Sequence, residues 1–163
     1  MKTFTTIFMI LAIVAGLVLA LTPFIANKIF PVPEKVVRQA KPEAAAMALK
    51  KWFKSPDAQF IAVQAINKSA SGNTHSWFTF SVGRRPVEKY IIDKKLQQSS
   101  LTPNVLNEVF FENRRPASWW QPAAIAQKTY FSGVDQGRQV SLIYNPDSKR
   151  GVLVTNSTSQ NTQ

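Results

Sequence analysis

Two arginine pairs, each followed by a proline, are the residues whose type and spacing most directly suggest a binding chemistry. Segments 80–86 and 110–116 share a leading Phe, a turn-forming residue and the run Arg-Arg-Pro. A guanidinium group is a planar fork of donors that binds a carboxylate or a phosphate through two hydrogen bonds. We therefore expect an anion- or partner-binding clamp if the two pairs meet at one end of the domain. Its members would be Arg84, Arg85, Arg114 and Arg115.

Trp119 and Trp120 follow the second arginine pair and extend the candidate site. An indole stacks on a sugar ring or lies in a membrane interface, and it also fills a core. We expect one of the two to be a core residue. The competing interpretation of the arginine pairs is that each ends a secondary-structure element and exposes its charges to solvent, as charge clusters usually do.

Catalytic and metal-binding patterns are scarce. His75 is the single imidazole, and neither Ser76 nor Ser81 lies in a nucleophile-elbow pattern that would complete a triad with it. Glu108 and Glu112 lie one helical turn apart, without a second carboxylate pair to oppose them. The chain has no Cys, which excludes disulfides, thiolate catalysis and zinc–thiolate sites. The sequence thus predicts a non-enzymatic protein with no catalytic residue, no metal site and no cofactor.

An uncharged apolar segment at residues 4–26 predicts a membrane-spanning helix. Its 23 residues would extend about 34 Å as a helix, enough to cross a hydrocarbon core of about 30 Å. We favour an uncleaved signal-anchor, because the apolar run is longer than the core of a secretory signal. The alternative is cleavage after Ala20, which would release a secreted protein.

The charges beside this segment bear on its orientation. Lys2 precedes it, and a basic membrane-proximal set follows it: Lys28, Lys35, Arg38 and Lys41. The positive-inside rule, counted literally, places the following domain in the cytoplasm. The very short N-terminal tail is the usual start of an exported chain, so we expect an extracytoplasmic domain on the periplasmic side of a cell membrane.

Hydrophobic periodicity places the remaining elements. Segment 42–54 has an apolar helical face and Pro42 at its start, and Thr102 with Pro103 begins a short helix that ends near residue 113. Strands are expected at 60–66 and 77–82, with a polar loop over 67–76 between them. Segment 87–98 fits either a helix or a strand. A final three-stranded meander covers 128–134, 138–144 and 151–154, with Val140, Leu142 and Tyr144 on the buried side of its middle strand.

These elements predict an α+β class: one transmembrane helix, then a small domain with an antiparallel sheet of about five strands and two or three helices. The expected division is a signal-anchor at 1–27, a basic juxtamembrane linker at 28–41, the domain at 42–156 and a disordered tail at 157–163. Over residues 42–155 the order of elements resembles the layout of cystatin-like or NTF2-like domains. The likeness lies in that order alone.

The function expected from the sequence is that of a single-pass, non-enzymatic envelope protein. Its basic domain, in a chain of net charge +11, would bind a partner protein or an anionic lipid or glycan, as an accessory subunit of a larger membrane assembly. Two alternatives remain: a secreted hydrolase or inhibitor, and a cytoplasm-facing nucleic-acid binder. The aromatic residues form no RNA-binding motif, so nucleic acid is the least favoured partner.

Overall fold

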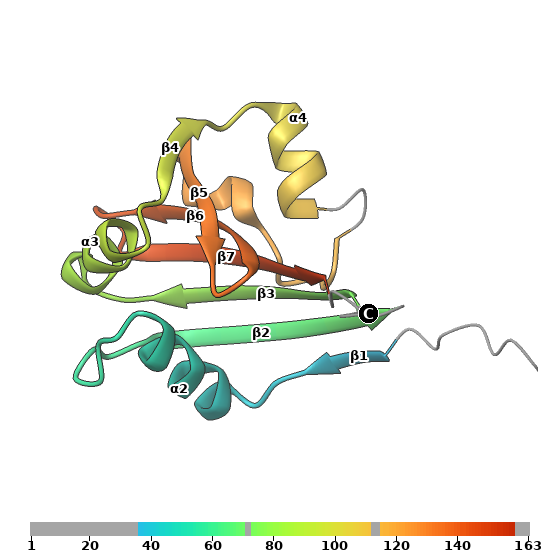
Figure 1. Cartoon of the computed structure of the whole chain (residues 1–163), viewed down its shortest axis with the longest axis horizontal. Coiled ribbons are helices and arrows are strands. Elements are labelled where there is room, and N and C mark those ends of the chain that lie inside the picture. The colour runs from blue at the N-terminus through green and yellow to red at the C-terminus, as the bar shows by residue number, and fades with distance from the viewer. Residues whose placement is uncertain (1–35, 71–72, 112–114, 159–163) are drawn as a thin grey trace, which may run out of the picture. The chain divides into compact units, whose positions relative to one another are not determined.

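A seven-stranded antiparallel sheet forms the centre of the domain (Figure 1). The computed structural model describes residues 36–70, 73–111 and 115–158, all within one compact unit, Lys35–Gln163. The strand order is β1-β2-β3-β7-β6-β5-β4. The α+β class is confirmed, whereas the expected number of about five strands is wrong, because both edge strands lie in segments without a clear hydrophobic alternation.

The strands along the chain are β1 (Val36–Gln39), β2 (Ile61–Ala70), β3 (Asn73–Ser81), β4 (Gln97–Ser100), β5 (Thr129–Asp135), β6 (Arg138–Asn145) and β7 (Arg150–Thr158). The helices are α2 (Pro42–Trp52), α3 (Arg84–Asp93), α4 (Pro103–Val105), the π-helix η1 (Leu106–Phe111) and the 3₁₀-helix η2 (Pro122–Ile125). Residues 36–39, expected to be part of the linker, thus form an edge strand, and segment 87–98 divides between α3 and β4.

The hairpin of β2 and β3 is longer than its apolar residues suggest. The expected polar loop at 67–76 is wrong, because pairing continues from Ile66↔Trp77 to Ala70↔Asn73. The polar side chains of this stretch belong to strands that extend beyond the apolar core. Hydrophobic alternation detects a strand only where one of its faces is buried in apolar surroundings.

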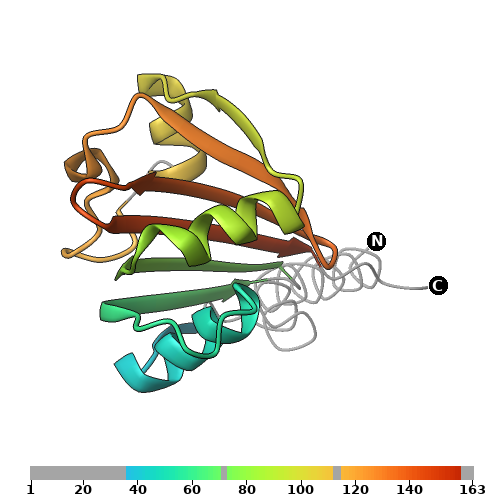
Figure 2. The ribbon, with the colours of Figure 1, turned by 90° about the vertical axis from the view of Figure 1, so that its left-hand side faces the viewer.

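The first face of the sheet is covered by α2 and α3, as Figure 2 shows. Pro42 occupies the first turn of α2, where its missing N–H costs nothing, and the helix buries Ala45 and Leu49. Phe53, just after α2, stacks on Tyr90 of α3 with ring centroids 4.3 Å apart. This aromatic contact fixes the two helices against the same core.

The second face is covered by α4, η1, η2 and the segment that leads to η2. Phe110, Trp120 and Ile125 are fully buried there against the strands. Strand β6 is consequently buried on both sides. Val140, Leu142 and Tyr144 face the first core, as predicted, while Ser141 and Ile143 are also buried on the opposite face.

Local chemistry explains the helix start and the turn that could be recognised in the sequence. The Thr102 hydroxyl accepts a hydrogen bond from the backbone N–H of Val105, which confirms the predicted cap. The turn between β5 and β6 places Gln136 and Gly137 at φ of 51° and 76°. Two consecutive left-handed residues suit the twist of a tight hairpin, and Gly adopts that conformation without strain.

Within the described ranges, no helix is both long and apolar enough to cross a membrane. The segment expected to do so, 4–26, lies outside these ranges, as do Lys28 and Lys35 of the membrane-proximal set and residues 159–163 of the expected tail. Arg38 lies in β1 and Lys41 immediately precedes α2, and both are exposed.

Candidate anion-binding surface

The N-terminus of α3 presents the first arginine pair to solvent. Gly83 precedes the helix in an extended conformation, and Arg84 and Arg85 occupy its first turn. The Arg84 Nε donates to Glu88 Oε1 at 2.6 Å, one helical turn away, and both side chains are exposed. Such a surface pair adds little stability. Glu88 offsets the charge of Arg84 locally, whereas Arg85 remains an exposed cation. The pair therefore begins a helix, whereas the sequence suggested that it ends an element.

Arg85 lines an open cleft between the end of α2 and the start of α3. Its volume is about 620 Å³. The opposite wall is the segment 54–58, and the Lys89 Nζ donates to the Lys54 carbonyl oxygen at 3.4 Å across the gap. Arg85, Lys54 and Lys89 thus surround a cleft in which Asp57 is the one acid among the described lining residues.

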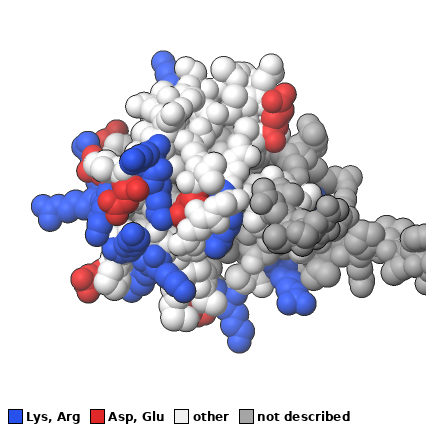
Figure 3. All heavy atoms as spheres, viewed as in Figure 1, with Lys and Arg blue, Asp and Glu red and all other residues white. Residues whose placement is uncertain are grey.

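The same end of the sheet carries further cations from two other elements. Backbone pairing joins Arg150 to Ser81, and the Val82 N–H donates to the Lys149 carbonyl oxygen, so the β6–β7 turn lies beside the start of α3. Lys50 and Lys51 lie in the last turn of α2. We define the basic end as these residues with the cleft cations: Lys50, Lys51, Lys54, Arg84, Arg85, Lys89, Lys149 and Arg150. Figure 3 shows Lys and Arg gathered over the side of the molecule formed by α2 and α3.

Acidic residues at the basic end are fewer: Asp57 in the cleft, Glu88 beside Arg84, and Asp147 in the β6–β7 turn. All eight cations except the half-buried Lys50 are exposed. Exposed charges of one sign attract polyanions over roughly a Debye length, about 8–10 Å at physiological salt. This end of the domain can therefore attract an acidic partner without a preformed deep pocket.

A buried tyrosine fixes the backbone from which the basic end projects. The Tyr144 hydroxyl donates to the Val82 carbonyl oxygen at 2.9 Å, just before the first turn of α3. Burial raises the pKa of Tyr144, and the charge of Arg84 opposes that shift. The hydroxyl therefore remains a donor at neutral pH and holds the strand end in place.

The second arginine pair does not join the first. Arg115 lies over the Phe111 ring, with its guanidinium carbon 5.9 Å from the centroid, and Phe111 packs against the core of the second face. Arg84 and Arg85 project from α3, which packs on the first face. The two sites are thus on elements that cover opposite faces of the sheet. Arg114 lies outside the described ranges.

The two neighbouring tryptophans have different environments. Trp120 is fully buried, whereas Trp119 is half-buried and contacts it edge-on at 6.0 Å between ring centroids. Trp120 is therefore the core residue that was expected among the two. Trp119 keeps partial access to solvent.

His75 and the two candidate serines do not come together. His75 stacks on Trp77 at 5.8 Å on the second face, whereas Ser76, its strand neighbour, is buried on the first. Ser81 lies six positions further along β3, about 20 Å away at the usual rise per residue. Glu108 lies on η1 near His75, and Glu112 is outside the described ranges. Among the residues described, no three His, Asp or Glu side chains form a metal-binding group.

Comparison with protein-family models, with curated proteins and with solved structures gives no match. The function of the basic end must therefore be argued from its residues and their geometry. Sequence reasoning found Arg84 and Arg85 but missed the contributions of Lys54, Lys89 and the β6–β7 turn. The lysine-rich end of segment 42–54 could have pointed to a basic surface. The fold, however, is needed to show that this end lies next to Arg85.

Proposed function

We propose that the chain is a single-pass, non-enzymatic membrane protein whose extracytoplasmic domain binds an acidic partner protein through its basic end. The observation that carries this proposal is the convergence of α2, α3 and the β6–β7 turn on one exposed surface with eight cations and three acids. The same surface supports a role as an accessory subunit of a membrane assembly. A non-enzymatic domain on a membrane anchor can contribute to such an assembly by binding one of its other proteins.

The position of this surface within the sheet favours a protein partner over lipid headgroups. The chain enters the domain at Val36, which pairs with Ser69 beside the turn of the β2–β3 hairpin. The basic end lies at the other end of β3, whose nine residues extend about 30 Å. Attraction to a charged membrane surface decays within a Debye length of about 8–10 Å. The cations of the basic end therefore lie several Debye lengths along the sheet from Val36.

The proposal includes the cystatin-like or NTF2-like layout expected from the sequence. A helix before a long hairpin, followed by a meander that returns to pair with that hairpin, supports it. The layout gives no catalytic chemistry by itself, because function resides in the site and not in the fold.

Membrane attachment is tested by alkaline-carbonate extraction of the full-length chain. The expected result is retention in the membrane pellet with an intact mass that includes residues 1–20. Release of a chain that begins at Leu21 would establish the secreted alternative. A periplasmic reporter fused at the C-terminus should be active, and an inactive reporter would place the domain in the cytoplasm.

Binding at the basic end is tested with polyglutamate as a defined acidic probe and the full-length chain in neutral detergent. The double variant Arg85→Glu and Lys89→Glu should weaken binding at least about tenfold, or ~1.4 kcal/mol, and reduce its salt dependence. The matched control, Arg38→Glu and Lys41→Glu, makes the same charge change where the chain enters the domain and should have a smaller effect.

Three results would contradict the proposed surface or partner. Equal losses in the two double variants would show that only net charge matters. Binding to anionic lipid vesicles in preference to polyglutamate, reduced mainly by the Arg38 and Lys41 changes, would establish a lipid-facing surface. Tight, salt-sensitive binding to duplex DNA together with a cytoplasmic reporter would establish the nucleic-acid alternative.

A further inference from the structure

A polar groove crosses the second face of the sheet, away from the basic end. Two adjoining hollows, of about 580 and 130 Å³, share Gln139 and Asn156 in their walls. The larger reaches Gln97 of β4 and Ser132 of β5, and the smaller reaches His75 of β3. Together they span five neighbouring strands, about 19 Å at the usual inter-strand spacing.

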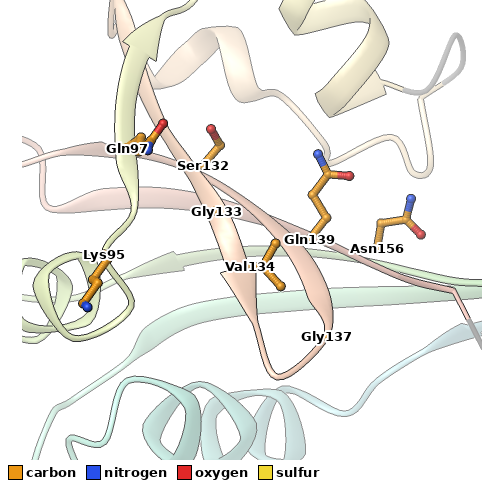
Figure 4. Close-up of a pocket in the computed structure, with 8 residues that line it drawn as sticks. All are labelled: Lys95, Gln97, Ser132, Gly133, Val134, Gly137, Gln139 and Asn156. Carbon is orange, nitrogen blue, oxygen red and sulfur yellow. The ribbon is translucent and has the colours of Figure 1, made fainter.

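Strand register aligns the polar side chains of this groove into two rows. One row runs Gln97↔Ser132↔Ser141, and the second runs Gln139↔Asn156↔His75. Each row lies across the strands on the face that η1 partly covers. Figure 4 shows Gln97, Ser132, Gln139 and Asn156 projecting on the same side of the sheet, whereas Lys95 points away from them.

The groove floor contains polar atoms that the fold leaves unused. Ser141 is 4% exposed and lines the smaller hollow beside Val109 and Glu108 of η1. The Oδ1 atom of Asn156 is buried and has no hydrogen-bond partner among the described residues. The same holds for Nε1 of Trp77, whose side chain faces this side of the sheet. Buried polar groups normally have partners, so the Asn156 acceptor in the wall of the groove is available to a hydrogen-bond donor of a ligand.

The chemistry of the lining is nearly neutral on a strongly basic protein. Three carboxamides, two hydroxyls and an imidazole are accompanied by one Lys and one Glu. A carboxamide offers donors and an acceptor together, which matches a ligand with hydroxyl groups that also donate and accept. The 67% exposed Val134 adds an apolar patch at one end, against which the C–H face of a ring can pack.

We propose that this groove binds a glycan, a neutral polyhydroxylated chain. The glycan would lie across strands β3, β7, β6, β5 and β4, in that order. The carboxamides of Gln97, Gln139 and Asn156 hydrogen-bond its hydroxyls, and η1 closes one side of the site. The π-helical form of η1 agrees with this role, because π-turns are frequent at functional sites. The groove is separate from the basic end, so it adds a second binding site to the domain.

The test uses the full-length chain in neutral detergent with maltoheptaose and N-acetylchitotetraose as neutral probes, followed by nitrogen-edited NMR of the side-chain amides. Shifts of the Gln97 and Gln139 amide signals on addition of either sugar, unaffected by added salt, are the expected result. Gln139 is exposed, so Gln139→Ala should fold normally and weaken binding roughly three- to tenfold.

Adjacent glutamines on β4 provide the control. Gln97 lines the groove, whereas Gln98 lies on the other face of the sheet and donates to the Thr129 hydroxyl at 3.1 Å. Gln97→Ala should weaken sugar binding and Gln98→Ala should not. Equal effects of the two changes, shifts confined to other residues, or no binding of either sugar would each overturn the proposal. Preferential binding of an uncharged extended peptide would also overturn it and would identify the groove as a peptide site.

Discussion

The indole Nε1 of Trp120 donates a hydrogen bond to the carbonyl oxygen of Phe110 at 2.8 Å, and both side chains are fully buried. This bond joins the end of the π-helix η1 to the segment that leads into η2. It spans residues 112–114, so one donor fixes both sides of that segment. It adds to the packing of the second face, where both side chains belong to the core.

Trp120→Phe should reduce the free energy of unfolding by about 2 kcal/mol, because it removes the donor and leaves a smaller ring in a closed site. Trp119→Phe should cost less than about 1 kcal/mol, since Trp119 is half-buried and makes no such bond. Urea unfolding followed by circular dichroism measures both variants. A Trp119 variant as destabilised as the Trp120 variant would contradict this assignment.

Lys94 and Asp135 form an ion pair at 2.5 Å with side chains only 15% and 12% exposed. Lys94→Met should cost about 2–3 kcal/mol in unfolding free energy, because the Asp135 carboxylate would remain in place without its cation. The neighbouring Lys95 is exposed, so Lys95→Met is the matched control and should have little effect. Chemical denaturation of the two variants gives the comparison, and similar stabilities would rule out a structural role for the pair.

Gly151 is required by close packing in the centre of the sheet. A Cβ at this position would lie 2.6 Å from the Phe80 ring and 3.3 Å from Tyr144. Gly151→Ala should therefore destabilise the fold by about 1–3 kcal/mol, because both rings belong to the first core. At Gly83 a Cβ meets no atom within 4 Å, so Gly83→Ala should cost less, about 0.5 kcal/mol, from the weaker N-cap of α3 alone. Thermal unfolding of the two variants under the same conditions distinguishes these outcomes.

Tyr90 makes stability depend on pH in the alkaline range. Burial, and then the charge and hydrogen bond of Asp135, raise its pKa above the ordinary value of 10.0. The unfolded chain therefore loses this proton first, and stability falls as the pH rises from about 10 towards the folded-state pKa. In the variant Tyr90→Phe, the free energy of unfolding should fall less steeply between about pH 9 and pH 11. Urea unfolding at a series of pH values measures this slope. An unchanged slope would show that other groups cause the loss.

Much of the fold follows from local patterns in the sequence. The helix at Pro42, the cap at Thr102 and the final meander were all predictable, because each has an apolar periodicity or a turn residue of its own. The edge strand β1 was not, since Val36–Gln39 is short and pairs only along β2. Strand β4 is polar and exposed throughout, so no hydrophobic pattern marks it. It is recognised as a strand only through its pairing with β5.

The candidate sites were less predictable because they depend on which segments the sheet brings together. Arg84 and Arg85 stood out as a local motif, but their neighbours Lys54 and Arg150 come from distant segments. The polar groove was missed altogether, because none of its residues forms a local motif. Gln139 and Asn156 look like ordinary solvent-facing strand residues until register places them side by side.

The pairing of β3 with β7 joins residues 73–81 to residues 150–158 in the middle of the sheet. The ribosome makes β7 well after β3, so the centre of the sheet cannot form until β7 has emerged. This long-range pairing slows the step that completes the sheet. If the chain is exported, this delay keeps it in a form that can be threaded through a translocation channel, and folding is completed on the far side.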